Sequence, residues 1–473
     1  MKNLYYAFCR SEYLAVGLSI AVAVIPLRAN AHATGQNLVA LLPTGPYTAV
    51  GVSIVALSII LLLFLPSRSA SQLLPSRKIA GQISMSCARF VSSVFFFLLI
   101  CWGCLQGFTG TRDPLENPLV LGFWLAFWVV SPIVQGYLFD LWAWISPWSW
   151  ASSALDSLKA RPILRMPRRL GVWPAVVLLF GFSTFTLADP APDNPERLAT
   201  VLLCYVTLTL VCMAIFGGRR WLEQAEFFSV LMVQFGQLAI FGQRGKSLYA
   251  GCPSWQLANR KSVLPGIPIF ILVLLGTGSF DGFNETFLWL NLIGVNPLEF
   301  PGRSAVVIPV VVGLISSNMS LVLLFVTMIA IGDRLVLGKT ELRHLVHKFA
   351  PTILPIALAY HTAHYLPSLL VDGQYVLLAF NDPLNTGANL LGLEGYYVTT
   401  GFFNHRETMR AVWLGQALVI VFGHVIAVIL AHTVSVDLYG NMQRGFRAGV
   451  PLGIFMVLYT WLGLWLLASP KGG

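Results

Sequence analysis

Two pairs of histidines stand inside apolar stretches of this sequence, where an imidazole is costly to leave without a partner. The first pair is His361 and His364, within the segment Tyr-His-Thr-Ala-His-Tyr that begins at Tyr360. At a spacing of three residues, both rings lie on one face of a helix. The second pair is His424 and His432, in the next apolar stretch. Because consecutive antiparallel helices usually pack together, we expect His361, His364 and His424 to meet, with His432 two turns away as a weaker member.

Two carboxylates could complete a site with these histidines. Asp281 ends a long apolar stretch and stands near glycines, so its side chain can turn inward. Glu299 follows in the segment Asn-Pro-Leu-Glu-Phe-Pro-Gly-Arg, which ends at Arg303. Either carboxylate could act as a catalytic base or as a ligand. A mixed histidine–carboxylate set suits a divalent transition metal such as zinc, copper, iron or manganese.

Each of these residue groups also has a simpler explanation. Histidines on neighbouring helices can hydrogen-bond to one another without a metal, or serve as axial ligands of haem. Asp281, Glu299 and Arg303 can anchor helix ends at the membrane surface or form an ion pair there. Ionisable groups inside a membrane are functional by default, which favours a ligand site for the histidines.

The composition identifies the class of protein that must hold these side chains. Of the 473 residues, 56% are hydrophobic and 11% are charged, about half the charged fraction of a soluble domain. The net charge of +10 does not indicate nucleic-acid binding, because the basic residues cluster in short loops between apolar stretches. The chain is therefore expected to be a multi-pass membrane protein whose surroundings are a lipid bilayer.

The first 31 residues have the pattern of a secretory signal peptide. Lys2 and Arg10 precede a short apolar core, and Ala29-Asn-Ala31 fits the small-x-small cleavage rule. Cleavage after Ala31 would leave His32 as the new N-terminus. A free amine beside an imidazole is a chelate that Cu(II) favours, although a histidine can stand there by accident of the cleavage site.

The remaining residues, 32–473, are expected to form a single membrane-embedded domain, an all-α transmembrane helical bundle. A length of about 20 apolar residues per crossing predicts about ten spans. These are residues 46–65, 89–108, 119–141, 170–188, 198–217, 263–280, 304–331, 349–371, 411–432 and 450–468. The basic loops then fall on one side and both mature termini on the other. Residues 221–262 are interpreted as an amphipathic surface helix or, alternatively, as a re-entrant piece packed against the bundle.

Several short segments together resemble a bacterial family of membrane proteins labelled fenitrothion hydrolase. The resemblance covers most of the mature chain and rests on residues 349–352, 360–365, 279–282, 296–302, 382–383, 423–424 and 431–432. It implies hydrolysis of an organophosphorus triester by a bacterial membrane protein. Together with the charge bias of the loops, this predicts a location in the inner membrane with both mature termini in the periplasm. The resemblance implies no catalytic residues.

Joined to this resemblance, the histidines suggest a metal-dependent phosphotriester hydrolase, aryldialkylphosphatase-like, acting on a small apolar substrate. A metal on His361, His364 and His424 could activate water, with Asp281 or Glu299 as base or ligand. Two other classes remain open. Histidines inside a membrane also mark metal or proton pathways of transporters, with His32 as an outer copper-capture site, and they occur in haem-binding or metal-binding accessory subunits.

Overall fold

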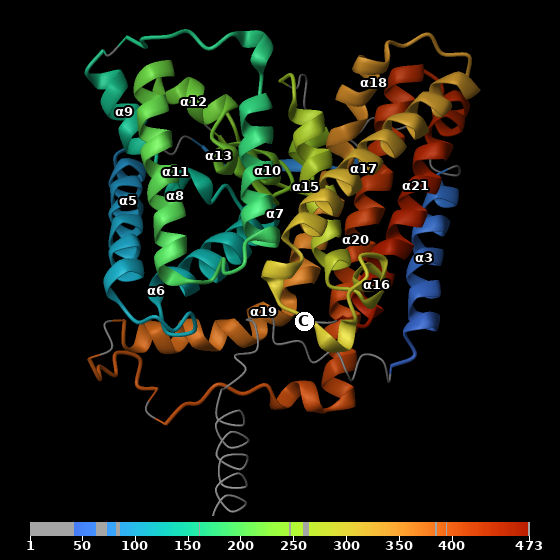
Figure 1. Ribbon diagram of the computed structural model, residues 1–473. Coiled ribbons are helices and arrows are strands. Elements are labelled where there is room, and N and C mark those ends of the chain that lie inside the picture. Colours follow the sequence, from blue (N-terminus) through green and yellow to red (C-terminus); the bar gives the residue numbers. More distant parts are fainter. Residues whose placement is uncertain are drawn as a thin grey trace, which may run out of the picture. The chain divides into compact units, whose positions relative to one another are not determined.

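The computed structural model describes residues 42–62, 73–81, 86–159, 161–245, 247–258, 264–383, 386–393 and 395–471, all within one compact unit (Figure 1). The expected signal peptide and His32 lie outside these residues. The longer helices of the described part are α3 (Thr44–Leu61), α5 (Ser86–Thr109), α10 (Trp173–Ala188), α11 (Pro195–Phe216), α15 (Ile267–Asn284), α17 (Val307–Leu335), α19 (Leu354–Asn381), α20 (Arg406–Tyr439) and α21 (Met442–Ala468).

Short helices connect the long ones, and the expected helical bundle is present. They are α8 (Trp142–Ile145), α9 (Ser149–Ser157), α12 (Gly218–Gln224), α13 (Phe227–Gly236), α14 (Trp255–Ala258), α16 (Phe287–Leu292), α18 (Leu342–Phe349), and the 3-10 turns η3 (Arg168–Leu170), η4 (Pro297–Glu299), η5 (Arg303–Ala305), η6 (Ala350–Ile353) and η7 (Gly401–Asn404).

Among the described residues, eight helices are long and apolar enough to cross a membrane. Many large apolar side chains on their outer faces are exposed, such as Phe95 on α5 and Leu323 on α17. A soluble protein rarely exposes so much apolar surface, whereas lipid-facing helices require it. The other two expected spans, residues 170–188 and 349–371, correspond to α10 and α19. Helix α10 is shorter than those eight helices, and α19 is less uniformly apolar than they are.

The third crossing is interrupted by a π-helix. It runs through α6 (Pro118–Leu121), η2 (Gly122–Val130) and α7 (Ser131–Tyr137). In η2 the backbone N–H of Ser131 bonds back to the carbonyl of Ala126, five residues earlier. Such wide turns are rare and are often found at functional sites.

Helix α19 extends beyond its expected end. The sequence predicts a loop from Asp372 onward, but the helix continues to Asn381. Pro367 lies inside it and has no backbone N–H, which permits a bend. Helix α19 contacts η2 and α6, and Figure 1 shows its orange C-terminal part running across the end of the bundle.

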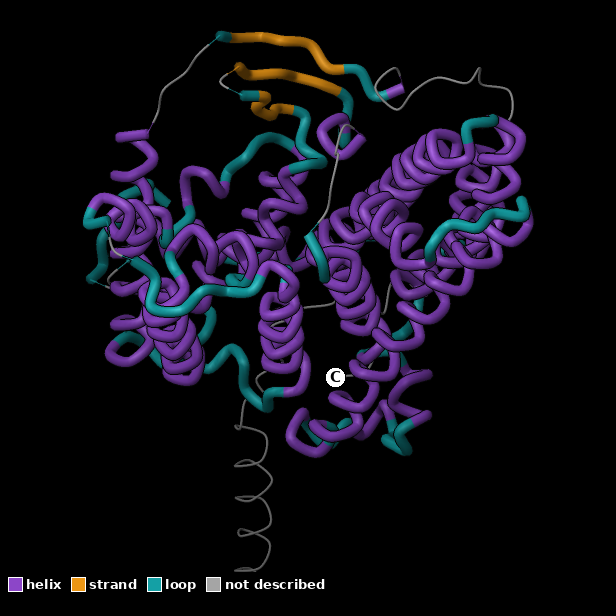
Figure 2. Tube along the Cα trace, turned by 90° about the horizontal axis from the view of Figure 1, so that it is seen from above, coloured by secondary structure: helices purple, strands orange, loops and turns teal. Residues whose placement is uncertain are grey.

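The segment 221–262 is neither a surface helix nor entirely helical. Eight of the ten residues of α13 are buried, because α13 packs among α7, α10 and α12, so the packed alternative is the better description. Two short strands follow, β2 (Phe241–Arg244) and β3 (Ser247–Gly251), and β3 also pairs with β1 (Ser76–Ala80). This antiparallel sheet, in the order β1-β3-β2, lies at one edge of the molecule in Figure 2 and was not predicted.

Candidate functional site

Helices α15 and α19 approach each other closely at two glycines. Gly278 and Gly282 are four residues apart on α15 and face Tyr360 of α19. A Cβ at Gly282 would stand 2.1 Å from the Tyr360 hydroxyl, and one at Gly278 would stand 3.3 Å from its ring. Small residues at this spacing let transmembrane helices pack tightly. The glycines therefore bring Asp281, which lies between them, against the histidine segment of α19.

Asp281 is bonded to two side chains of α19. Its Oδ2 atom lies 3.0 Å from Nε2 of His364 and accepts a hydrogen bond of 3.2 Å from the Tyr365 hydroxyl. The Tyr365 oxygen in turn accepts a 3.1 Å bond from the indole N–H of Trp128 in η2. Only 11% of the His364 side chain and 16% of the Asp281 side chain are exposed. Three elements thus fix one carboxylate within the bundle.

His361 lies in the same cavity as this pair. The cavity has a volume of about 50 Å³, and Asp281, His361, His364 and Tyr365 all line it. The His361 ring packs against Trp128 and Tyr365, with centroids 5.4 Å and 5.0 Å away, and lies beside the main chain of η2. Its Nε2 atom is buried and has no hydrogen-bond partner among the described residues. A buried nitrogen without a partner calls for a ligand or a water molecule.

His424 points elsewhere, although α20 packs against α19 as expected. The contact is made by the neighbouring glycine: a Cβ at Gly423 would stand 2.4 Å from the Ala359 Cβ. The His424 ring instead places Nδ1 2.9 Å from the carbonyl of Ile420 and lies 6.3 Å from the Tyr459 ring of α21. Its Nε2 atom is also buried without a partner among the described residues. His424 is not part of the lining of the Asp281 cavity.

The other predicted site residues are also apart from this cavity. His432 lines a separate cavity of about 30 Å³ between α20 and α21. Glu299 is exposed in η4. Arg303 comes closer, because its Nη2 donates a 2.6 Å bond to the carbonyl of Thr186, a residue of the cavity lining.

Asp382, another residue of the family resemblance, holds the end of α19. Its carboxylate accepts hydrogen bonds from the backbone N–H groups of Thr386, at 2.9 Å, and Gly387, at 2.7 Å. The Thr386 bond is the main cause of a lowered pKa for Asp382, because it stabilises the charged form. This geometry indicates a structural function for Asp382.

The donors suit a metal in type, but their arrangement does not form a ready site. Two imidazoles and one carboxylate are a common set for zinc, iron or manganese, and the unpaired Nε2 of His361 is available. However, no three His, Cys, Asp or Glu side chains in the described part of the chain are grouped so that they could hold an ion.

Reasoning from the sequence missed the aromatic partners of the site. Tyr365 bridges Trp128 and Asp281, and Tyr360 fills the space left by the two glycines. A signal was present, because Tyr360, His361, His364 and Tyr365 fall on one helical face. No local pattern could have indicated Trp128, since it comes from a helix far away in the sequence.

Comparisons of the chain with protein-family models, with curated proteins and with solved structures gave no match. The case for a function therefore rests on the residues of the site: a buried aspartate–histidine pair, held by tyrosine and tryptophan beside an unpaired imidazole, within a bundle of apolar helices.

Proposed function

We propose that Asp281 and His364 are the catalytic pair of a membrane-embedded hydrolase that acts on apolar organophosphorus triesters. Their cavity of about 50 Å³ has room for the attacking water, and the ester would bind at its opening. The observation that carries the proposal is the 3.0 Å contact between Asp281 and His364, in one cavity with the unpaired Nε2 of His361. The resemblance to fenitrothion hydrolases supplies the substrate class. Glu299, which is exposed, has no part in this site.

His364 is the proposed general base. When its Nε2–H donates to Asp281, the neutral ring carries its lone pair on Nδ1, which can accept a proton from water. Asp281 then stabilises the imidazolium that forms, because the carboxylate is fixed by Tyr365 as well. Trp128 holds the Tyr365 hydroxyl in place. Apolar walls around this group keep bulk water away and strengthen each polar contact.

A divalent transition metal is a separate proposal, with His361 and Asp281 as its ligands. His364 is not a ligand because its one lone pair serves as the base, and no three such donors among the described residues are grouped to hold an ion. Such an ion would polarise the phosphoryl or thiophosphoryl group and lower the pKa of water. His32, His424 and His432 are not included, because His32 lies outside the described residues and the other two do not line the cavity.

Purified protein in detergent, given a dialkyl 4-nitrophenyl phosphate, should release nitrophenolate. His364→Ala should lower kcat by about 10²- to 10⁴-fold, the usual contribution of a general base, and leave a measurable residual rate, whereas His432→Ala, in a separate cavity, should retain the wild-type rate. Elemental analysis should find one transition metal per chain in the wild type and in His432→Ala, and less than half of that in His361→Ala. A wild type without turnover would refute the hydrolase. Turnover in a metal-free protein would refute the proposed metal but not the proposed hydrolase.

A proton-coupled transporter is the second candidate, and the same pair favours it. Asp281 and His364 come from two different helices, α15 and α19, and a proton on such a buried pair could bias helix movement. Purified protein in sealed liposomes separates the two candidates. Proton-driven flux of a metal ion without ester hydrolysis supports the transporter, and hydrolysis without a sealed membrane supports the enzyme.

The proposed location is the bacterial inner membrane, with ten crossings, a cleaved signal peptide and both mature termini in the periplasm. The exposed basic segment between α9 and α10, residues 161–169, lies at the same end of the bundle as α18 (Figure 1). The start of α3 and the C-terminus lie at the opposite end. The end rich in basic residues is the proposed cytoplasmic end. Labelling of cysteines introduced at the exposed residues Ser157 and Gly45, from either side of the membrane, tests this orientation.

A further inference from the structure

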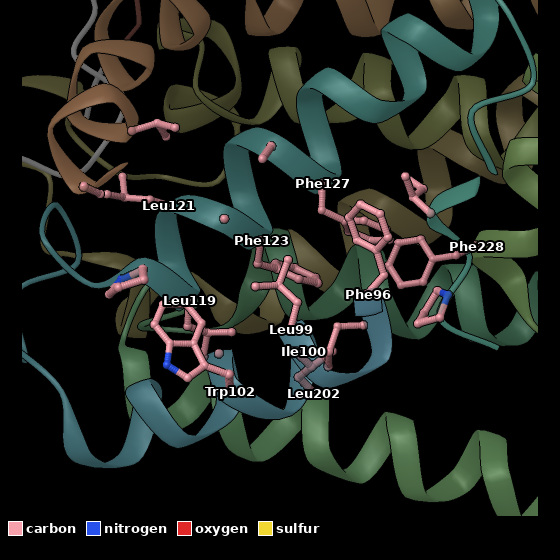
Figure 3. Close-up of a pocket in the computed structure, with 18 of the residues that line it drawn as sticks. Phe96, Leu99, Ile100, Trp102, Leu119, Leu121, Phe123, Phe127, Leu202 and Phe228 are labelled. Carbon is pink, nitrogen blue, oxygen red and sulfur yellow. The ribbon is translucent and has the colours of Figure 1, made fainter. Parts of the chain in front are cut away.

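A second and larger cavity lies beside η2, away from the site described above. Its volume is about 270 Å³, and its walls come from α5, η2, α11 and the far part of α19. The lining side chains are almost all aromatic or aliphatic, including Phe96 and Trp102 of α5 and Phe380 of α19. Figure 3 shows Phe96, Phe127 and Phe228 together at one end of the cavity. An apolar space of this size destabilises a protein unless something fills it.

The size and the walls of the cavity indicate an aromatic occupant. An apolar cavity of about 150 Å³ stays dry and binds benzene, so this cavity has room for a substituted or fused ring. Aromatic walls offer edge-to-face contacts that a flat ring uses better than a flexible acyl chain does. The cavity is therefore suited to a small aryl compound.

One polar group in the lining has no partner. The indole N–H of Trp148 is buried and makes no hydrogen bond to the described residues. The neighbouring Trp142, by contrast, donates its N–H to the Ser229 hydroxyl at 3.1 Å. Because a water-sized atom can reach almost none of the surface of this nitrogen, the aromatic walls rather than this donor define the occupant.

A single layer of rings separates this cavity from the Asp281 cavity. Phe127 and Phe228 line the large cavity and lie 4.8 Å apart, whereas Trp128 and Phe182 line the small one and lie 4.7 Å apart. The Phe182 and Phe228 centroids are 5.5 Å apart, which joins the two pairs. Phe127 and Trp128 are consecutive in η2, so one π-helical turn presents one ring to each cavity.

We propose that the large cavity is a binding site for a small apolar aryl compound, with η2 as the wall between it and the Asp281 cavity. This binding goes beyond the proposed hydrolysis and is measured without turnover, so either claim can fail alone.

The test uses 4-fluoroacetophenone, an aryl ketone, and the full chain in phosphatidylcholine nanodiscs. Fluorine NMR should show a saturable bound resonance, distinct from that of empty nanodiscs, at one site per chain. Gly122→Leu should weaken binding at least tenfold, because Gly122 lines the cavity and a Cβ there meets nothing within 4 Å. The matched control is Gly181→Leu on α10, where a Cβ also meets nothing and which is not part of the lining.

Ala126→Trp also places a large side chain in the lining and serves as a second test if Gly122→Leu fails to fold. Thermal unfolding shows whether all three variants are folded. Wild-type affinity in both folded filling variants would overturn the proposal. So would a wild type that shows only the resonance of empty nanodiscs, since a lipid chain or nothing would then fill the cavity.

Discussion

Replacing Asp281 with asparagine removes one charge and leaves the shape of the site almost unchanged. The bonds from His364 and Tyr365 both end on the same carboxylate oxygen, Oδ2. Both groups are donors, so the amide will turn its oxygen toward them and keep both bonds. His364 then retains its tautomer, and the variant tests the charge of Asp281 rather than its geometry.

The expected loss follows from the strength of that contact. A hydrogen bond to a charged group contributes about 1.5–3 kcal/mol and a neutral one about 0.5–1.5 kcal/mol, so the bond that asparagine keeps to the imidazolium is weaker by about 1–1.5 kcal/mol. At 1.36 kcal/mol per tenfold, kcat should fall by about 5- to 13-fold. KM should change little, because the carboxylate is not proposed to contact the substrate.

Nitrophenolate release by the purified protein measures both constants. Glu285→Gln is the matched control: Glu285 follows Asp281 by four residues, directly after the end of α15, and its side chain pairs with Lys471 at 3.0 Å, outside the cavity. In a His364→Ala background, Asp281→Asn should cost less than threefold, because the two residues act as a unit. A single variant within threefold of wild type, or fully additive losses in the double variant, would refute the role of the pair.

Two further predictions concern the residues around Asp281. Gly282→Val should lower the free energy of unfolding by about 1–3 kcal/mol in a denaturant titration, because its side chain would collide with Tyr360. Gly373→Val, where a Cβ meets nothing within 4 Å, should lower it far less, and equal losses would contradict the close helix contact. Tyr365→Phe should reduce kcat by at least about tenfold through the lost bond to the Asp281 carboxylate, because a bond to a charged group contributes about 1.5–3 kcal/mol. Unchanged kcat in that variant would show that the tyrosine does not hold the carboxylate.

Much of the bundle could be predicted from the sequence, because long apolar stretches leave a membrane chain few alternatives to helix. The inward turn of Asp281 and the shared face of His361 and His364 were also predictable from glycine placement and helical spacing. The sheet was not, since β1 meets β3 far along the chain and neither strand is apolar enough to indicate a partner. The burial of α13 was hidden too, because an apolar helix among helices has no distinctive period.

The direction of His424 shows why the packing of consecutive helices was not a sufficient guide. Two helices can pack together as expected while a given ring is rotated about the helix axis toward another neighbour. Gly423 is the point where α20 touches Ala359 of α19. The next residue is turned by about 100°, which directs His424 toward Tyr459 of α21. The adjacent glycine was therefore the signal that His424 would face another helix.

The small sheet has a consequence for how the protein is made. Strand β1 pairs with β3, which lies about 170 residues later in the chain. The ribosome synthesises about 5–20 residues per second. While the intervening helices emerge from the ribosome, β1 waits for about ten to thirty seconds with its edge unpaired. The sheet therefore forms late in folding, only after the first half of the bundle has been inserted.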